Sequence, residues 1–196
     1  MTPTPHVHPP SPPGQHRRAS FTALYAGMAS IIMLFGAFTS AMVVRRGASK
    51  DWRGTPAPQL LWVNTAVLAA SSVVAERARR HLRNNDRVHF NYWWSGATLL
   101  GAGFIAAQGL LWRRLVDAGV YLNSNPGSAF FYIGTVAHAL HLFGVWLWMF
   151  YLWTKAVRLQ LGPSRRTGVD VCTVFWHFLG VLWLYLMFLF IYWGNR

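Results

Sequence analysis

The 26 residues from Ser128 to Trp153 constrain the fold of this chain more than any other stretch. They include no Asp, Glu, Lys or Arg, yet they hold His138 and His141 near their middle. At about 1.5 Å rise per residue, a helix of this length extends about 39 Å, enough to cross the roughly 30 Å hydrocarbon core of a bilayer. We therefore predict a transmembrane helix, and its two ionisable side chains are candidates for function.

Four further apolar blocks indicate a polytopic membrane protein. Charged residues make up 12% of the 196 residues, whereas a soluble domain carries about 25%. We predict an all-α fold, a bundle of five transmembrane helices over residues 21–44, 59–74, 92–112, 128–153 and 171–193, the second being the shortest. Residues 1–19 are rich in proline, which blocks helix, and are predicted to form a disordered tail before a single domain over 20–196.

The distribution of Lys and Arg predicts the orientation. The N-terminal flank and the second and fourth loops together hold eleven of these residues, against seven on the other side. The positive-inside rule therefore predicts a cytoplasmic N-terminus and a C-terminus outside. These cations lie at helix ends, where they reach lipid headgroups, so the net charge of +13 does not indicate nucleic acid. The candidate headgroup contacts are Arg45, Arg46, Arg77, Arg113 and Arg114.

Few polar residues fall inside the predicted helices. We expect Asn64 and Gln108 to hydrogen bond between helices, because membrane helices associate through such contacts and through small residues. The small residues that would allow close approach are Gly101, Gly103, Ala106, Ala107, Gly134 and Gly144. The single cysteine, Cys172, excludes an intrachain disulfide and is expected to pack as a small apolar side chain.

His138 and His141 are three residues apart and project from neighbouring positions on one helical face. Ligation of haem or metal needs a further imidazole at matched depth, and the remaining membrane candidate is His177. By helix rise, His141 lies about 18 Å and His177 about 9 Å from the cytoplasmic ends of their helices. This mismatch favours neutral imidazoles hydrogen-bonded to neighbouring helices or to a partner subunit, with ligation and a proton relay as the alternatives.

The residues alone favour an accessory or assembly subunit. No Ser-His-Asp, CxxC, P-loop or HExxH pattern is present in the sequence. A transporter typically has broken helices, an internal repeat or a carboxylate at the bilayer midplane. The five acidic residues instead fall near helix ends or in loops: Asp51, Glu76, Asp86, Asp117 and Asp170. We therefore expect no catalytic residues in this chain.

Five segments carry motifs that occur together in one family. They are ASIIMLFGAFTSAMVVRR (29–46), NTAVLAASSVVAERA (64–78), GAGFIAAQGLLWRRL (101–115), SAFFYIGTVAHALHLFGV (128–145) and FWHFLGVLWLYLMFLFIYW (175–193). The fourth places His138 and His141 on the family's histidine pair, and the fifth places Trp176, His177 and Trp183 on its closing motif. In order and spacing they resemble subunit III of the haem-copper terminal oxidases, which include cytochrome c and quinol oxidases, in its short five-helix form.

The resemblance implies a non-catalytic subunit of an aerobic respiratory oxidase in a bacterial plasma membrane. Such a subunit binds no haem, copper or other metal itself, and packs against the catalytic subunit I that carries them. It supports the stability and the proton-uptake side of subunit I, and holds phospholipid between its helices. Contacts with subunit II, small subunits or a respiratory supercomplex are also expected. Trp176 and His177 are expected at a helix–helix contact or a headgroup, with a polar partner for the imidazole.

Three positions depart from the family pattern. Ile31, Leu111 and Gly180 stand where the family often carries carboxylates, so any role of those acids in proton supply does not carry over to this chain. Two alternatives remain open: a related accessory subunit of a quinol oxidase or nitric oxide reductase, and a stand-alone membrane transporter.

Overall fold

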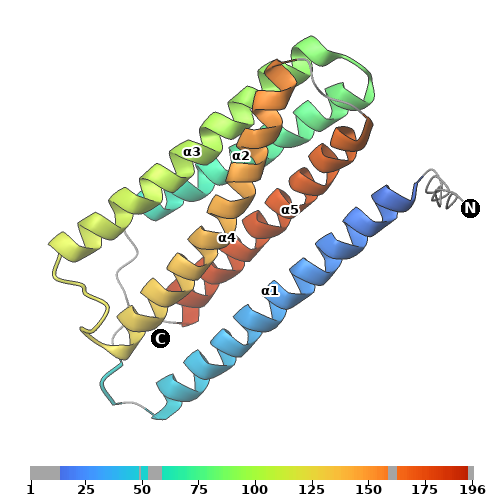
Figure 1. Ribbon diagram of the computed structural model, residues 1–196. Coiled ribbons are helices and arrows are strands. Elements are labelled where there is room, and N and C mark those ends of the chain that lie inside the picture. Colours follow the sequence, from blue (N-terminus) through green and yellow to red (C-terminus); the bar gives the residue numbers. More distant parts are fainter. Residues whose placement is uncertain (1–13, 49, 53–58, 159–162, 194–196) are drawn as a thin grey trace, which may run out of the picture.

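The structure is a computed structural model that describes residues 14–48, 50–52, 59–158 and 163–193. These residues form five long helices and the connections between them (Figure 1). The helices are α1 (Gln15–Ala48), α2 (Gln59–Arg83), α3 (Arg87–Asp117), α4 (Pro126–Val157) and α5 (Pro163–Phe188). A π-helical turn, Leu189–Trp193, extends α5. The predicted all-α bundle of five helices is confirmed.

Four of the described helices are long and apolar enough to span a membrane: Arg17–Ala48, Arg87–Asp117, Pro126–Val157 and Arg166–Ile191. α2 differs in composition, because charged residues follow one another from Glu76 onward. Its apolar part therefore covers little more than the predicted 59–74. Its 25 residues still extend about 38 Å, and α2 packs against both α3 and α5.

Each helix extends beyond the apolar block that predicts it. α3 begins at Arg87 and ends at Asp117 instead of covering 92–112, and α5 begins at Pro163 instead of near residue 171. Polar residues can continue a helix into the headgroup region because the intrahelical hydrogen bonds still satisfy the backbone there. α1 begins at Gln15, within the predicted tail, whose residues 1–13 lie outside the described residues.

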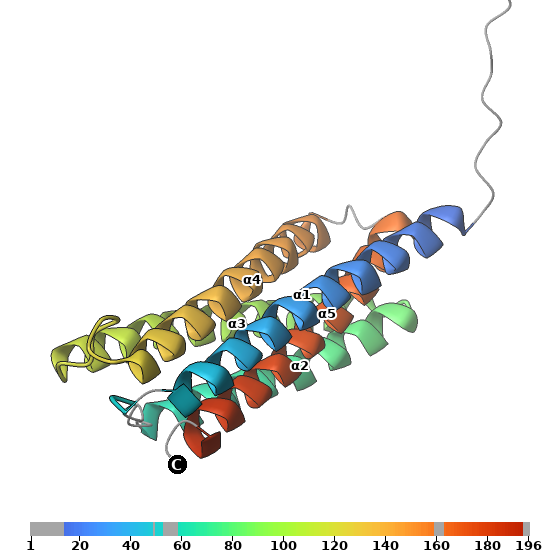
Figure 2. The same cartoon turned by 90° about the horizontal axis from the view of Figure 1, so that it is seen from below.

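α2, α3, α4 and α5 form the body of the bundle, and α1 lies along its edge (Figures 1 and 2). α2 and α3 are antiparallel neighbours with the most extensive contact, and α5 packs against both α2 and α4. α1 contacts α5 and α4, but only 17% of its most apolar stretch is buried, against 39–44% for the other three spans. Much of the α1 surface is therefore left for lipid or for another chain.

A tight turn of three residues joins α2 to α3. The N–H of Asn85 donates to the carbonyl of Leu82 at 3.2 Å, and the N–H of Asp86 donates to the carbonyl of His81 at 3.0 Å. This is the Schellman pattern, and Asn85 adopts the left-handed conformation that it requires (φ 60°). Asp86 then caps α3, because its Oδ1 accepts the N–H of His89 at 3.2 Å. The same residue thus closes one helix and opens the next.

Side chains also fix the start of α4. Asn125 accepts the N–H of Ser128 at 3.0 Å, and the Ser128 hydroxyl accepts the N–H of Asn125 at 3.3 Å. This reciprocal capping box satisfies two backbone donors that the first helical turn leaves free. Pro126 follows directly at the first helical position, where its missing N–H costs nothing.

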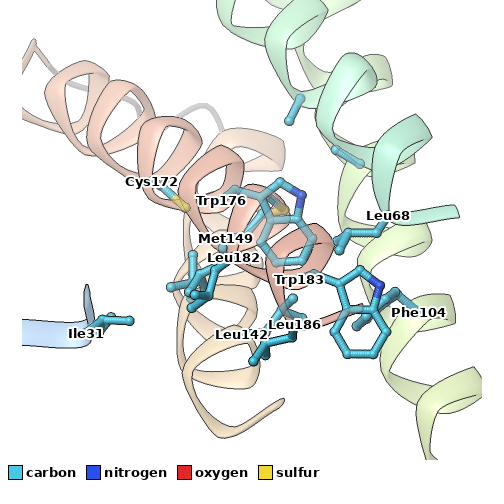
Figure 3. Packing of buried hydrophobic residues seen from close by; sticks show 14 of the residues in the cluster. Ile31, Leu68, Phe104, Leu142, Met149, Cys172, Trp176, Leu182, Trp183 and Leu186 are labelled. Carbon is cyan, nitrogen blue, oxygen red and sulfur yellow. The ribbon is translucent and has the colours of Figure 1, made fainter. Parts of the chain in front are cut away.

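Tryptophan side chains hydrogen bond between helices in the core, where Figure 3 shows Trp176 and Trp183 among the buried apolar residues. The Nε1 of Trp176 donates to Ser71 Oγ and that of Trp183 to Thr65 Oγ1, both at 3.0 Å and both from α5 to α2. Four further indole bonds of 2.7–3.3 Å join α3 and α4: Trp94 to Met149 O, Trp112 to Thr135 Oγ1, Trp146 to Thr98 O and Trp153 to Ser95 Oγ. Each indole thus adds a polar contact to its large apolar surface.

Two glycines permit close approach of the helices. A Cβ at Gly101 would lie 2.9 Å from an atom of Trp146 and 2.9 Å from an atom of Trp176, and a Cβ at Gly134 would lie 2.9 Å from two phenylalanine rings. Real Cβ atoms do not approach other atoms so closely, so both positions need glycine. At the other two predicted glycines, Gly103 and Gly144, a Cβ would meet no atom of the described residues within 4 Å, so the prediction of a close approach within this chain is wrong there.

Replacement of Gly101 by alanine should destabilise the bundle. The added methyl group would press on two indoles that themselves hydrogen bond to other helices, and overpacking of this kind costs about 1–3 kcal/mol. Gly103→Ala is the matched control on the same helix, and should be neutral or slightly stabilising because alanine has the higher helix propensity. Unfolding of the full chain in mixed micelles measures both changes, and equal stabilities of the two variants would contradict the packing described here.

Candidate functional site

A buried amide pair joins α2 to α3. The Nδ2 of Asn64 donates to the Oε1 of Gln108 at 3.0 Å, and both side chains are almost fully buried. The sequence predicts a bond between helices for each of these residues without naming its partner, and the structure pairs them with each other. Asn64 Oδ1 and Gln108 Nε2 have no hydrogen-bond partner among the residues described.

His138 is fully buried and lies against the indole of Trp183. The two ring centroids are 5.3 Å apart and the planes are inclined by 30°. Neither imidazole nitrogen has a hydrogen-bond partner within the described part of the chain, so the predicted bond to a neighbouring helix is wrong for His138. The reason is that the N–H of the facing indole is already donated to Thr65.

His141 has a different environment although it lies less than one turn away. Its Nδ1 is 2.7 Å from the carbonyl oxygen of Ala137 on its own helix. Its ring centroid is 6.2 Å from that of Phe35 on α1. Among the described residues His141 therefore bonds within its own helix, because a step of three residues turns the side chain by about 60° from the core towards α1. A bond from this half-buried ring to a partner subunit stays a prediction.

Trp176 and His177 lie where α5 packs against α2. Trp176 is fully buried and bonds to Ser71, and the Nε2 of His177 is 3.7 Å from Glu76 Oε2. His138, His141 and His177 therefore have separate neighbours: an indole, a helix carbonyl and a carboxylate. The structure does not bring these three histidines together.

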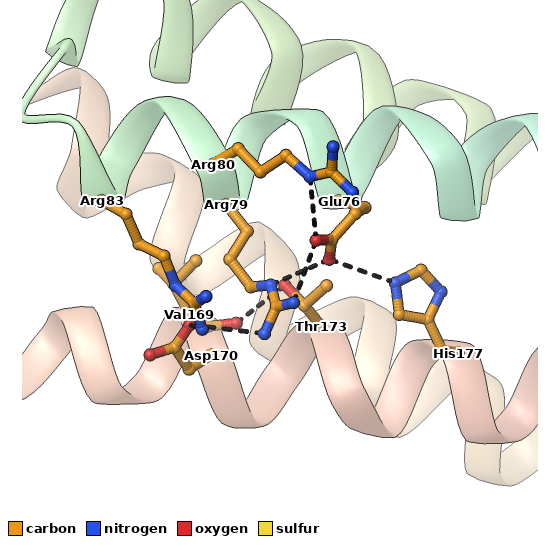
Figure 4. Close-up of polar contacts among 8 residues, drawn as sticks. All are labelled: Glu76, Arg79, Arg80, Arg83, Val169, Asp170, Thr173 and His177. Atoms are coloured by element: carbon orange, nitrogen blue, oxygen red, sulfur yellow. Dashed lines mark hydrogen bonds and ion pairs between the residues drawn. The ribbon is translucent and has the colours of Figure 1, made fainter.

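Charged residues join α2 to α5 in a single group, which we call the ion-pair cluster (Figure 4). Arg79 donates from Nε to Glu76 Oε2 at 2.8 Å and from Nη2 to Glu76 Oε1 at 3.0 Å. Its Nη1 lies 3.7 Å from Asp170 Oδ1 on α5, so this guanidinium bridges two acids on two helices. The members of the cluster are Glu76, Arg79, Arg80, Arg83, Asp170 and His177.

The hydrogen bonds from Arg79 hold the pKa of the Glu76 carboxyl, which lies beyond the apolar part of α2, below its ordinary value. Arg80 adds a bond of 3.2 Å to Glu76, and Arg83 adds one of 3.3 Å to Asp170. This cluster is not among the sites predicted from the sequence. Its signal is an acid followed three and four residues later by arginines, with a second acid at the same end of another helix.

The five arginines predicted at lipid headgroups lie in the last turns of helices or towards their ends: Arg45, Arg46, Arg77, Arg113 and Arg114. Arg45 is exposed and lies 3.8 Å from the carboxylate of Asp51. The guanidinium of Arg77 lies over the ring of Trp93, 5.2 Å from its centroid. These positions suit contact with headgroups, and that contact stays a prediction.

An apolar groove of about 250 Å³ lies between α2 and α5, beside the ion-pair cluster. Its walls are mainly aliphatic, with Thr65, Ser72 and His177 as the polar members. Two further grooves border α1, one of about 380 Å³ towards α4 and α5 and one of about 340 Å³ against α5. Each is lined mainly by apolar side chains, as a surface facing acyl chains requires.

Comparison with known proteins identifies the family. Residues 21–195 match the family model described as Cytochrome c oxidase subunit III. The chain belongs to the cytochrome c oxidase subunit III family. It is 30% identical over 161 residues to the probable cytochrome c oxidase subunit 3 of Nocardia farcinica, which covers 80% of this chain and 79% of that relative. It is 31% identical over 167 residues to the cytochrome c oxidase subunit 3 of Synechocystis sp., which covers 83% and 70%.

Two of the three positions at which this subunit III departs from the expected pattern have apolar surroundings. Ile31 and Leu111 are buried in the hydrophobic core. Gly180 lines the groove between α2 and α5, where a Cβ would lie 3.5 Å from Ser72 Oγ.

Replacement of Glu76 by glutamine should weaken the contact between α2 and α5. Hydrogen bonds between charged groups contribute about 1.5–3 kcal/mol each, so we expect the free energy of unfolding to fall by about 1–3 kcal/mol. Arg80→Gln is the matched control, since that side chain is 73% exposed and its loss should cost less than about 0.5 kcal/mol. Denaturation of the detergent-solubilised chain tests this; equal losses in the two variants would show that Glu76 does not join the helices.

Proposed function

We propose that this subunit III is a non-catalytic subunit that packs on subunit I of a haem-copper oxidase and stabilises it and its proton-uptake side. As a cytochrome c oxidase subunit III, the chain belongs to the respiratory oxidase complex. The observation that carries the proposal is that the polar groups in the interior contact other helices. Asn64 bonds to Gln108, six indoles bond between helices, and His138 stacks on Trp183. These groups serve helix packing.

The outer surface supports a role within an assembly. Large apolar side chains face outward from α1, α3 and α4, with exposed fractions of 75% for Met33, 72% for Leu99 and 67% for Leu140. Such a surface suits lipid and the apolar faces of other membrane subunits. We assign haem and copper to the partner subunits, with subunit I as the main contact and subunit II, small subunits or a supercomplex as further ones.

Phospholipid binding is the second part of the proposal. The grooves beside α1 have the apolar lining that acyl chains need, and arginines at the helix ends can reach the phosphates. Because α1 is the least buried of the four apolar spans, lipid in these grooves would cover apolar surface that α1 leaves open beside α4 and α5.

Purification of the tagged chain in mild detergent tests the assignment. We expect a haem-containing catalytic subunit to co-purify, identified by mass spectrometry, together with oxidation of reduced cytochrome c. The folded chain alone should show no Soret band. A Soret band in the isolated chain would refute the non-catalytic role, whereas quinol oxidation or nitric oxide reduction by the complex would place the chain with a different catalytic subunit.

The bacterial plasma membrane and the orientation predicted from the arginines complete the proposal. In a Cys172→Ala background, which removes the only cysteine, one new cysteine at Asn123 marks the α3–α4 connection and one at Asn84 marks the α2–α3 turn. An impermeant maleimide should label Asn123→Cys in spheroplasts, but Asn84→Cys only after permeabilisation. The reverse pattern would invert the orientation.

A further inference from the structure

The turn between α2 and α3 brings two imidazoles and a carboxylate together. The Nδ1 atoms of His81 and His89 lie 3.2 Å and 2.7 Å from Asp86 Oδ2. The two imidazole rings stack, with centroids 5.2 Å apart and planes inclined by 21°. One possible ligand atom from each of the three residues lies within 4.8 Å of the other two. Among the described residues, this is the group of histidine and acidic side chains that meets the spacing of a metal site.

The backbone fixes this arrangement. His81 belongs to the last turn of α2, Asp86 caps α3, and His89 is the third residue of α3. Asp86 Oδ1 accepts the N–H of His89, which leaves Oδ2 directed at the imidazoles. The Schellman turn holds the ends of both helices, so the three side chains start from defined positions.

We propose that His81, Asp86 and His89 form a binding site for a divalent transition metal of the Zn²⁺ class. Two imidazole nitrogens and one carboxylate oxygen are a common ligand set for such ions, and they leave a fourth position for water. Metal–ligand bonds of about 2.0–2.2 Å in a tetrahedron place the ligand atoms roughly 3.3 Å apart. The observed separations of 3.2 Å and 2.7 Å are close to this value, so small side-chain rotations admit the ion.

The surroundings permit a cation to reach this site. All three side chains are accessible, with exposed fractions of 34%, 35% and 63% for His81, Asp86 and His89. Arg80 and Arg83, the nearest cations on α2, are directed at the carboxylates of the ion-pair cluster.

The bound ion would link the end of α2 to the start of α3. A ligand that binds the folded state alone stabilises it by mass action, so metal should raise the melting temperature of the full chain. The site uses none of the residues to which the proposed function assigns a role. Failure of one proposal therefore leaves the other standing.

Zinc titration of the full chain in detergent tests the site. His6, His8 and His16 are replaced by alanine in every protein compared, so that they cannot bind zinc. This parent protein should bind one equivalent of Zn²⁺, detected by competition with a chromophoric chelator. Affinity should fall at least tenfold in His81→Ala and in His89→Ala. Val88→Ala, the exposed neighbour on the same turn, should match the parent.

A second variant separates metal binding from helix capping. Asp86→Asn keeps a side-chain oxygen that caps α3 as well as aspartate does, but removes the charge. It should retain the helical circular dichroism and the metal-free melting temperature of the parent, while losing at least tenfold in zinc affinity and the melting shift that zinc produces. Absence of saturable binding in the parent, or equal affinity in the parent and the two histidine variants, would overturn the proposal.

Discussion

The hydrogen bonds that tryptophan indoles donate between helices are the interaction on which the rest of this bundle depends. Inside a membrane, apolar burial alone gives helices little reason to associate, because lipid tails are as apolar as the side chains. An indole provides a large contact area and one donor that must find a partner. Trp176 and Trp183 attach α5 to α2, and four other indoles attach α4 to α3. α1 lies at the edge and attaches through a hydroxyl pair, Thr39 Oγ1 and Tyr185 Oη of α5 at 2.8 Å, and through ring contacts such as Phe38 with Phe130.

Ionic contacts complete this arrangement at one end of the molecule. The charged half of α2 would be costly beside hydrocarbon, but Arg79 joins Glu76 to Asp170 and so neutralises charge on two helices at once. The same contact fixes how α5 is rotated against α2, which in turn directs Trp176 at Ser71. The ion pairs and the indole bonds therefore both specify the contact between α2 and α5, at different levels along the two helices.

The sequence predicts the number and type of the helices because long uncharged runs have few alternatives in a membrane protein. It does not predict their ends, since charged residues such as Arg87 and Asp117 continue a helix at no cost to its backbone. That Asn64 and Gln108 each bond to another helix follows from residue type, because each amide needs a polar partner, but their pairing with each other is known only from the structure. The contact of His138 with Trp183 does not follow from residue type, because it depends on how α4 and α5 are rotated against each other. For the same reason, spacing alone cannot distinguish the packed Gly101 from the open Gly103.

Asp86 takes part both in the turn that ends α2 and in the cap that starts α3, so the chain reverses direction between the two helices within three residues. By length and composition α3 is apolar enough to span a membrane, whereas α2 is not among the four described helices that are. With so short a turn between them and the most extensive helix contact of the molecule, the two form one helical hairpin. Within that hairpin the long apolar stretch of α3 offsets the cost of holding the less apolar α2 in the bilayer, so the arginines of the ion-pair cluster are carried by a helix that needs its neighbour.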